Sequence, residues 1–103
     1  MKYKPLPFYL TIKKSKIHGH GIIANKNIKK DTTIGVVIYF NFFLPFRTND
    51  LGYYLNHSFN NNCKLYLIDN KYYLIATKNI KKNMELTINY DDTPWFIAGS
   101  WIL

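Results

Sequence analysis

The sequence predicts a mainly β protein, built from several short strands in small sheets with little helix. The first observation behind this prediction is a seven-residue unit, Ala24 to Lys30, that recurs with one change 52 positions later as Ala76 to Lys82. Each copy leads into a polar turn and then a β-prone run. The second observation is a pair of β-rich runs joined by Asp69-Asn70, residues that tolerate the positive φ of a hairpin turn. Two copies are too few for a solenoid, so we expect two similar strand-turn-strand units.

The expected elements can be placed in order along the chain. β-prone composition predicts strands over residues 9–13, 32–40, 65–68, 71–75 and 85–90. Only Leu51 to His57 could form a helical turn or two, with Asp50 as its cap, and Gly52 weakens that helix.

The length of 103 residues predicts a single domain, because a typical domain takes about 100 to 200 residues. Hydrophobic residues make up 48% of the chain, which is enough to form a core and argues against wholesale disorder. We expect one domain over residues 1–103, with the motif-bearing part at about residues 12–96 and an aromatic C-terminal tail at 97–103.

The chain carries a formal net charge of +8, which favours nucleic acid, anionic lipid or an acidic ligand as a partner. Residues 1–50 hold nine Lys or Arg against two Asp, whereas residues 51–103 hold five Lys against four acids. The sequence therefore assigns any electrostatic footprint mostly to the first half.

Cys63 is the only cysteine, which excludes an internal disulfide framework and any multi-cysteine zinc site made by this chain alone.

The N-terminal residues lack the apolar core of roughly 7 to 15 residues that a signal peptide needs. The most apolar stretch, Gly35 to Phe46, is interrupted by Asn41 and Pro45 and is shorter than the roughly 20 residues that span a bilayer. We expect a soluble intracellular protein without a membrane partner, in the cytoplasm of a host or bacterial cell, or in the nucleus of a eukaryotic host.

Chemistry could reside at three places, of which the first is the Gly-x-Gly turn Gly19-His20-Gly21. Two glycines one residue apart permit positive φ and let a backbone approach a ligand closely, although an ordinary turn is the default explanation for this motif taken alone. His18 and His20 could hold a metal, but no carboxylate or cysteine lies beside them in the sequence, so we expect no metal site.

The second place is the Asn56-His57-Ser58 triplet, which follows an apolar run and precedes three asparagines. Dense amide and imidazole groups at a turn can bind a polar ligand or satisfy buried backbone groups. A Cys63 nucleophile with His57 as its base is conceivable, although no orienting group can be assigned to the pair.

The third place is the predicted strand from Glu85 to Tyr90, followed by Asp91-Asp92 and an aromatic segment. Adjacent aspartates need not converge as an acid and base pair, which argues against hydrolase chemistry. A tyrosine at a strand end is more often half-buried packing than a catalytic group.

Taken in this order, the Gly-x-Gly turn, the Asn-His-Ser triplet and the Glu-Leu-Thr-Ile-Asn-Tyr strand resemble a SET domain, the β-clip fold of many protein-lysine methyltransferases. The resemblance implies a knot-like crossing of the chain near the Asn-His-Ser motif. The chain is similar to the minimal SET proteins of viruses and bacteria, without pre-SET or zinc-binding post-SET segments.

The resemblance implies the cofactor S-adenosylmethionine, with S-adenosylhomocysteine as the product, and a protein substrate that bears the target lysine. It assigns one catalytic residue, Tyr90. It implies a cofactor site made by Gly19, His20, Gly21, Asn56, His57 and Trp95. It also implies a substrate channel that includes Tyr39, Tyr54 and Phe96.

The chain departs from the family's pattern in three ways. Phe59 and Asn61 stand where relatives often have Cys and Pro, which leaves Asn62 in register. The segment between Phe40 and Asn56, where relatives form one wall of the substrate groove, is short. The cysteine-rich tail of many relatives is absent, so Trp95, Phe96 and Trp101, or a second subunit in a homodimer, would complete the lysine channel.

Two other functions stay open at this point. A small basic β-domain that binds nucleic acid would also explain the charge of +8 and the lysines interleaved with aromatic residues. A SET fold without catalytic activity could instead serve as a protein-binding module, although the presence of Tyr90 favours an enzyme.

Overall fold

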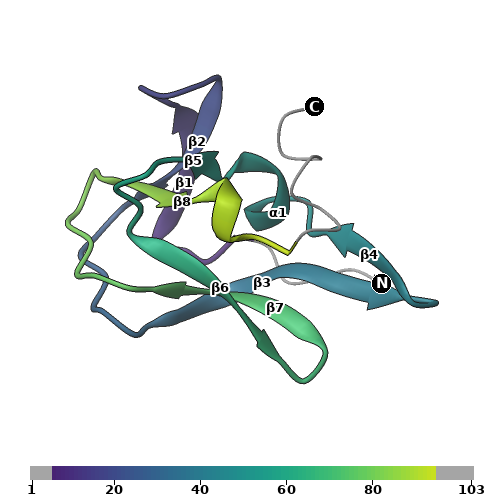
Figure 1. The fold of residues 1–103 in the computed structure, drawn as a ribbon. Coiled ribbons are helices and arrows are strands. Elements are labelled where there is room, and N and C mark those ends of the chain that lie inside the picture. The colour runs from purple at the N-terminus through teal and green to yellow at the C-terminus, as the bar shows by residue number, and fades with distance from the viewer. Residues whose placement is uncertain (1–5, 95–103) are drawn as a thin grey trace.

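The computed structural model describes residues 6–94 and shows eight strands in two sheets around a short helix (Figure 1). The strands are β1 (Leu10–Lys14), β2 (His20–Ala24), β3 (Thr33–Asn41), β4 (Leu44–Arg47), β5 (Asn56–His57), β6 (Cys63–Ile68), β7 (Lys71–Ala76) and β8 (Glu85–Ile88). The helices are α1 (Leu51–Tyr54) and the 3₁₀ turn η1 (Tyr90–Asp92). The prediction of a mainly β protein of short strands in small sheets is confirmed.

Each sheet has four strands. The first sheet has the order β1-β2-β8-β5, and its β5 and β8 run parallel although the other pairs are antiparallel. The second sheet has the order β4-β3-β7-β6 and is antiparallel throughout. In Figure 1, the long ribbon of β3 and β7 lies below the first sheet, and α1 lies between this ribbon and the first sheet.

The two copies of the repeat pair with each other. Ile28 and Ile80 occupy equivalent positions, form an antiparallel bridge and exchange two backbone hydrogen bonds of 2.8 Å. The asparagine beside each isoleucine reaches across to the other copy, since Asn79 Oδ1 accepts from Lys30 N and Asn27 Oδ1 accepts from Lys82 N, both at 2.9 Å. The repeat therefore forms a local two-fold arrangement instead of two independent units.

The same two-fold relation extends to the turns that follow the repeats. Asp31 and Asn83, 52 positions apart, both have a left-handed backbone, with φ of 71° and 74°. Their N–H groups donate at 2.7 Å to the carbonyls of Ala76 and Ala24, respectively. Asp and Asn are the non-glycine residues that adopt this conformation most readily, which explains their presence at these turns.

The core lies where the two sheets and the repeat meet. Its members come from all parts of the chain and are buried: Leu10, Ile22, Ala24, Ile28, Ile34, Val37, Ile38, Leu51, Leu55, Cys63, Leu74, Ala76, Ile80, Leu86 and Ile88. Both repeats contribute an alanine and an isoleucine at equivalent positions. The duplicated sequence thus supplies four of these core residues.

The two hairpins of the second sheet differ in their turns. Asp69 and Asn70 have φ of 48° and 63° and join β6 to β7, which confirms the predicted hairpin. The turn between β3 and β4 instead places Phe42 and Phe43 at φ of 52° and 66°, with 88% and 98% of their surface exposed. Bulky residues rarely adopt this backbone conformation, so the sequence contained no signal for that turn.

The structure corrects the predicted helix. The helix ends at Tyr54, and Asn56 and His57 form strand β5 instead of a second helical turn. Asp50 makes no side-chain cap, because Thr48 Oγ1 accepts from Gly52 N at 3.1 Å instead. Gly52 is required there, since a Cβ would lie 2.8 Å from the carbonyl oxygen of Val37. Within residues 6–94, no helix is long and apolar enough to cross a membrane.

The structure also corrects the predicted strand from Glu85 to Tyr90. Strand β8 ends at Ile88, and Asn89 begins the η1 turn by accepting a 3.0 Å hydrogen bond from Asp91 N at its Oδ1. Tyr90 is therefore the first residue of a 3₁₀ turn, where its side chain is not constrained to alternate along a strand.

Asn62 fastens the loop after β5 to β8, near the predicted crossing. Its side chain accepts from Thr87 N and donates to Glu85 O, both at 2.9 Å, and its own carbonyl accepts from Thr77 N at 2.8 Å. Asn62 is 6% exposed, so these groups have no access to bulk water as an alternative partner. The side-chain amide of Asn62 therefore makes the hydrogen bonds to β8 that a peptide group of a neighbouring strand would otherwise make.

We expect Asn62→Ala to lower the free energy of unfolding by about 2 to 4 kcal/mol, because it leaves one buried N–H and one buried C=O without partners. Denaturant titration followed by circular dichroism measures the change. Asn60→Ala, at an exposed position two residues away, should change stability by less than about 0.5 kcal/mol. Equal stabilities of the two variants would contradict this role of Asn62.

Candidate functional site

The loop between β1 and β2 is a closed polar turn. Ser15 N donates to Gly19 O at 2.7 Å, and the Ser15 hydroxyl accepts from Ile17 N at 2.8 Å and from His18 N at 3.2 Å. These bonds satisfy the backbone of the loop locally, as serine does in tight turns. The loop therefore presents Gly19-His20-Gly21 at the start of β2 in one defined conformation.

The two glycines of this turn occupy their positions for different physical reasons. Gly19 has φ of +47°, and a Cβ added to it would meet no atom within 4 Å. A Cβ on Gly21 would instead lie 2.7 Å from Glu85 Cδ and 3.2 Å from Asn56 Nδ2. Gly19 thus allows the left-handed backbone conformation and faces open space. Gly21 instead leaves room for the Glu85 side chain.

Asn56 joins this turn to the middle of the chain. Its side-chain nitrogen lies 3.0 Å from His18 O, 3.1 Å from His20 O and 2.8 Å from Glu85 Oε2. The residue is 7% exposed and belongs to β5, which runs parallel to β8. The first two sequence motifs are therefore in direct contact, although 36 positions separate His20 from Asn56.

His57 joins the Asn-His-Ser triplet to the third motif. Its Nδ1 accepts from Tyr90 N at 3.0 Å, and the two rings lie 5.1 Å apart. Phe59 packs edge-on against the other side of the imidazole, with ring centroids 4.5 Å apart. The imidazole is therefore held between the backbone of Tyr90 and the ring of Phe59.

Tyr90 is held at both ends. Its backbone N–H binds His57, and its hydroxyl donates to Leu55 O at 2.7 Å. Burial raises the pKa of the Tyr90 hydroxyl, an effect that the Arg47 charge opposes and the Glu85 charge reinforces. The hydroxyl therefore stays protonated at neutral pH, and its proton is engaged by Leu55 O.

The predicted channel residues lie apart from these contacts or outside the described residues. Tyr39 is on β3, where its ring stacks on Phe46 at 5.8 Å. Tyr54 ends α1 and is 36% exposed. Trp95 and Phe96 lie outside the described residues, as does Trp101. The short segment after Phe40 forms the β3–β4 hairpin and α1.

The structure argues against the alternative of a cysteine nucleophile. Cys63 is fully buried in the core, and burial raises the pKa of its thiol to about 12, which disfavours the reactive thiolate. His57 Nδ1 already accepts from Tyr90 N. In the part of the chain that the structure describes, no three His, Cys, Asp or Glu side chains are grouped so that they could hold a metal ion.

Sequence reasoning missed three residues that build the site. Glu85 was noted only as a strand residue, Ser15 was not singled out, and Leu55 acts through a backbone carbonyl that no sequence pattern reveals. The one sequence signal for Glu85 is that it is the single acid in its predicted strand, residues 85–90. The roles of Gly19, His20, Gly21, Asn56, His57 and Tyr90 toward a ligand stay predictions.

Comparison with known proteins agrees with this geometry. A family model described as the SET domain matches residues 45–91, which include Asn56, His57 and Tyr90. No curated protein matches the chain. Among solved structures, a crystal structure of a candidate histone methyltransferase from Plasmodium falciparum is similar with a TM-score of 0.58 and 24% sequence identity, covering 85% of this chain and 96% of that one. The chain therefore has the SET-domain fold, and the part of it that carries the second and third motifs matches the SET family.

Proposed function

We propose that this protein is an S-adenosylmethionine-dependent protein-lysine N-methyltransferase. The SET-domain fold supports this proposal, and so does the similarity to a protein described as a candidate histone methyltransferase. The observation that carries it is the chain of contacts from the Gly-x-Gly turn through Asn56 and His57 to Tyr90. These contacts bring the turn, the triplet and the tyrosine together as a methyl-transfer site of this family requires.

Two features of these residues support a cofactor site. Gly19 opens onto free space, so a ligand can approach its backbone. Ser58 N donates to Ile88 O at 3.0 Å, and alternation along a parallel pair then directs the N–H and C=O of His57 away from β8, toward a bound molecule. When bound, S-adenosylmethionine supplies an activated methyl group on a sulfonium. The residues that would hold it are Gly19, His20, Gly21, Asn56 and His57.

Tyr90 would position the reacting groups. Its hydroxyl donates to Leu55 O, which fixes the direction of the O–H bond, and the phenol would then align the attacking amine or the methyl group. Its raised pKa keeps it neutral, which suits alignment and electrostatic stabilisation better than proton abstraction. Methyl transfer is an in-line displacement, for which such alignment supplies much of the rate.

The attacking lysine amine needs to lose its proton, which costs about 4 to 5 kcal/mol at pH 7 for an ordinary lysine pKa of about 10.4. Two features of the chain lower this cost. The half-buried surroundings of Tyr90 disfavour a charged ammonium, and the Arg47 charge, which acts to lower the pKa of Tyr90, would disfavour it as well. A net charge of +8 acts in the same direction and favours a substrate lysine in acidic surroundings over one in a strongly basic tail.

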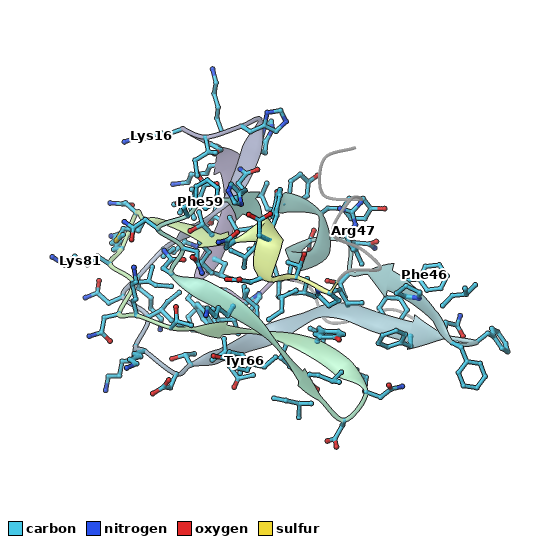
Figure 2. All side chains as sticks on the ribbon, viewed as in Figure 1. Lys16, Phe46, Arg47, Phe59, Tyr66 and Lys81 are labelled. Carbon is cyan, nitrogen blue, oxygen red and sulfur yellow. The ribbon has the colours of Figure 1, made fainter. Side chains whose placement is uncertain are left out.

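Polyanion binding is a second candidate function, supported by one structural observation. The bridge between Ile28 and Ile80 brings the two lysine-rich turns together, so that six exposed lysines from both halves of the chain share one end of the molecule: Lys26, Lys29, Lys30, Lys78, Lys81 and Lys82. Figure 2 shows Lys81 at the end opposite Phe46. The charged end could bind nucleic acid by itself or hold a nucleic-acid-bound substrate near the site.

We expect wild-type protein to transfer radiolabelled methyl groups to proteins of a cell lysate and Tyr90→Phe to lose on the order of 100-fold or more of that rate. Cofactor affinity, measured by calorimetry, should change little in Tyr90→Phe. Tyr66→Phe, at an exposed position on β6, is the matched control and should keep full activity. Wild-type rates in Tyr90→Phe would remove Tyr90 from the site, and the absence of both label and cofactor binding in the wild type would refute the function.

Asn56→Ala should weaken S-adenosylmethionine binding by about tenfold or more, which corresponds to about 1.4 kcal/mol. The amide holds the carbonyls of His18 and His20, so its loss releases the turn that would receive the cofactor. Calorimetric titration measures the change, with Asn41→Ala at the exposed end of β3 as the control. Unchanged affinity would argue against a cofactor site at this turn.

If the lysine end binds nucleic acid, affinity for a short DNA duplex should fall steeply as salt rises from about 50 to 200 mM. Replacing Lys29 and Lys81 together by Glu should abolish this binding. The same charge change at Lys64 and Lys71, which lie on the β6–β7 hairpin, should reduce it only weakly. Fluorescence anisotropy measures all three proteins, and equal losses in both double variants would attribute binding to net charge alone.

A further inference from the structure

We propose that Ser15, Asn56 and Glu85 form a polar clamp that holds the Gly-x-Gly turn in its binding conformation, with Glu85 as its positioning residue. The three side chains come from the loop after β1, from β5 and from β8. Neither Ser15 nor Glu85 needs to touch the cofactor to act. This inference rests on the proposed function, because it concerns how the turn receives S-adenosylmethionine.

Glu85 is the centre of the clamp because both of its carboxylate oxygens have partners. Oε1 accepts from the Ser15 hydroxyl at 2.7 Å, and Oε2 accepts from Asn56 Nδ2 at 2.8 Å. Hydrogen bonds to an ionised carboxylate are roughly twice as strong as neutral ones. Glu85 thus connects two segments that are 41 residues apart in the sequence.

Ser15 connects the Glu85 carboxylate to the backbone of the loop after β1. While its hydroxyl donates to Glu85, the same oxygen accepts from Ile17 N and His18 N and lies 3.1 Å from Asn56 Nδ2. The direction of the hydroxyl proton is therefore determined by the carboxylate. With that proton directed at Glu85, the oxygen lone pairs face the backbone N–H groups of the loop.

Asn56 connects the Glu85 carboxylate to the Gly-x-Gly turn. The two hydrogens of its amide nitrogen are shared among Glu85 Oε2 and the carbonyls of His18 and His20, which flank Gly19. All of these partners are acceptors and select the NH₂ end of the side chain, and the charged carboxylate is the strongest of them. A neutral partner would weaken this selection and loosen the contact of the amide with the two carbonyls.

Gly21 is the fourth part of this arrangement, since the Glu85 carboxylate occupies the space where a Cβ on Gly21 would lie. The second glycine of the motif therefore serves the clamp and not only a ligand. This predicts a specific dependence: the defect caused by Gly21→Ala should be smaller when the Glu85 side chain is shortened to alanine.

The test compares wild type with Glu85→Gln, Ser15→Ala and the double variant. Glutamine keeps the size of Glu85 but offers one acceptor oxygen and one NH₂ group, so it cannot accept from Ser15 and Asn56 at once. We expect Glu85→Gln to weaken the binding of S-adenosylmethionine and S-adenosylhomocysteine by about tenfold to 100-fold in calorimetry. The effects of Glu85→Gln and Ser15→Ala should be strongly non-additive, because both break the same link.

Asp69→Asn is the matched control for the loss of one negative charge, at an exposed turn where Asn tolerates the observed φ of 48°. It should leave cofactor affinity unchanged. Thermal unfolding of each variant separates loss of stability from loss of binding, and Gly21→Ala alone and with Glu85→Ala supplies the compensation measurement. Normal affinity in Glu85→Gln, or additive effects in the double variant, would overturn the clamp while leaving the methyltransferase proposal intact.

Amide chemical shifts and hydrogen exchange of residues 17–21 in the protein without cofactor give a reading that does not depend on binding. Glu85→Gln should shift these amides and speed their exchange, whereas amides of the β6–β7 hairpin should not change. If the wild type binds neither molecule, the proposed function fails, and this measurement still decides whether the clamp orders the turn. Unchanged amides in Glu85→Gln would refute the clamp.

Discussion

The structure depends on providing hydrogen-bond partners for the backbone N–H and C=O groups of β8 on all sides of the strand. This four-residue strand pairs with β2 in an antiparallel sense and with β5 in a parallel sense, and the side chain of Asn62 takes the remaining bonds of Glu85 and Thr87. A buried strand without these partners would leave unsatisfied N–H and C=O groups at a cost of about 1 to 3 kcal/mol each. Because those partners come from distant segments, satisfying β8 gathers the whole candidate site around it. Glu85 begins the strand beside the Gly-x-Gly turn, and Tyr90 follows its end.

The paired repeats supply the second constraint. Each repeat is too short to bury its own alanine and isoleucine, so the two copies bury them against each other through the bridge between Ile28 and Ile80. The same pairing puts two lysine-rich turns at one end of the molecule. Charge that the sequence distributes as +7 and +1 between its halves is therefore combined in space. Fold and electrostatics follow from one duplicated segment.

Rigidity and chemistry are linked in the arrangement around Tyr90. Its backbone is tied to the imidazole of His57 and its hydroxyl to the carbonyl of Leu55, so the phenol has little freedom to rotate. A hydroxyl fixed in this way is pre-organised, which suits the positioning role proposed for Tyr90. Burial keeps it protonated and so preserves that orientation at neutral pH.

The sequence by itself determined the mainly β class, the hairpin at Asp69-Asn70, the repeat and the three motifs, because each of these depends on neighbours in the chain: local turn chemistry, β-propensity and spacing. It extended β8 by two residues and the helix by three beyond their observed ends, since strand and helix ends depend on partners such as Asn89 and Thr48 that compete with local preference. Only the tertiary structure decided that the repeats pair with each other, that Gly21 leaves room for Glu85, and that Ser15, Asn56 and Glu85 meet. These are contacts between segments 29 to 70 residues apart, whose energies come from burial and hydrogen bonding in three dimensions and leave no periodic pattern in the chain.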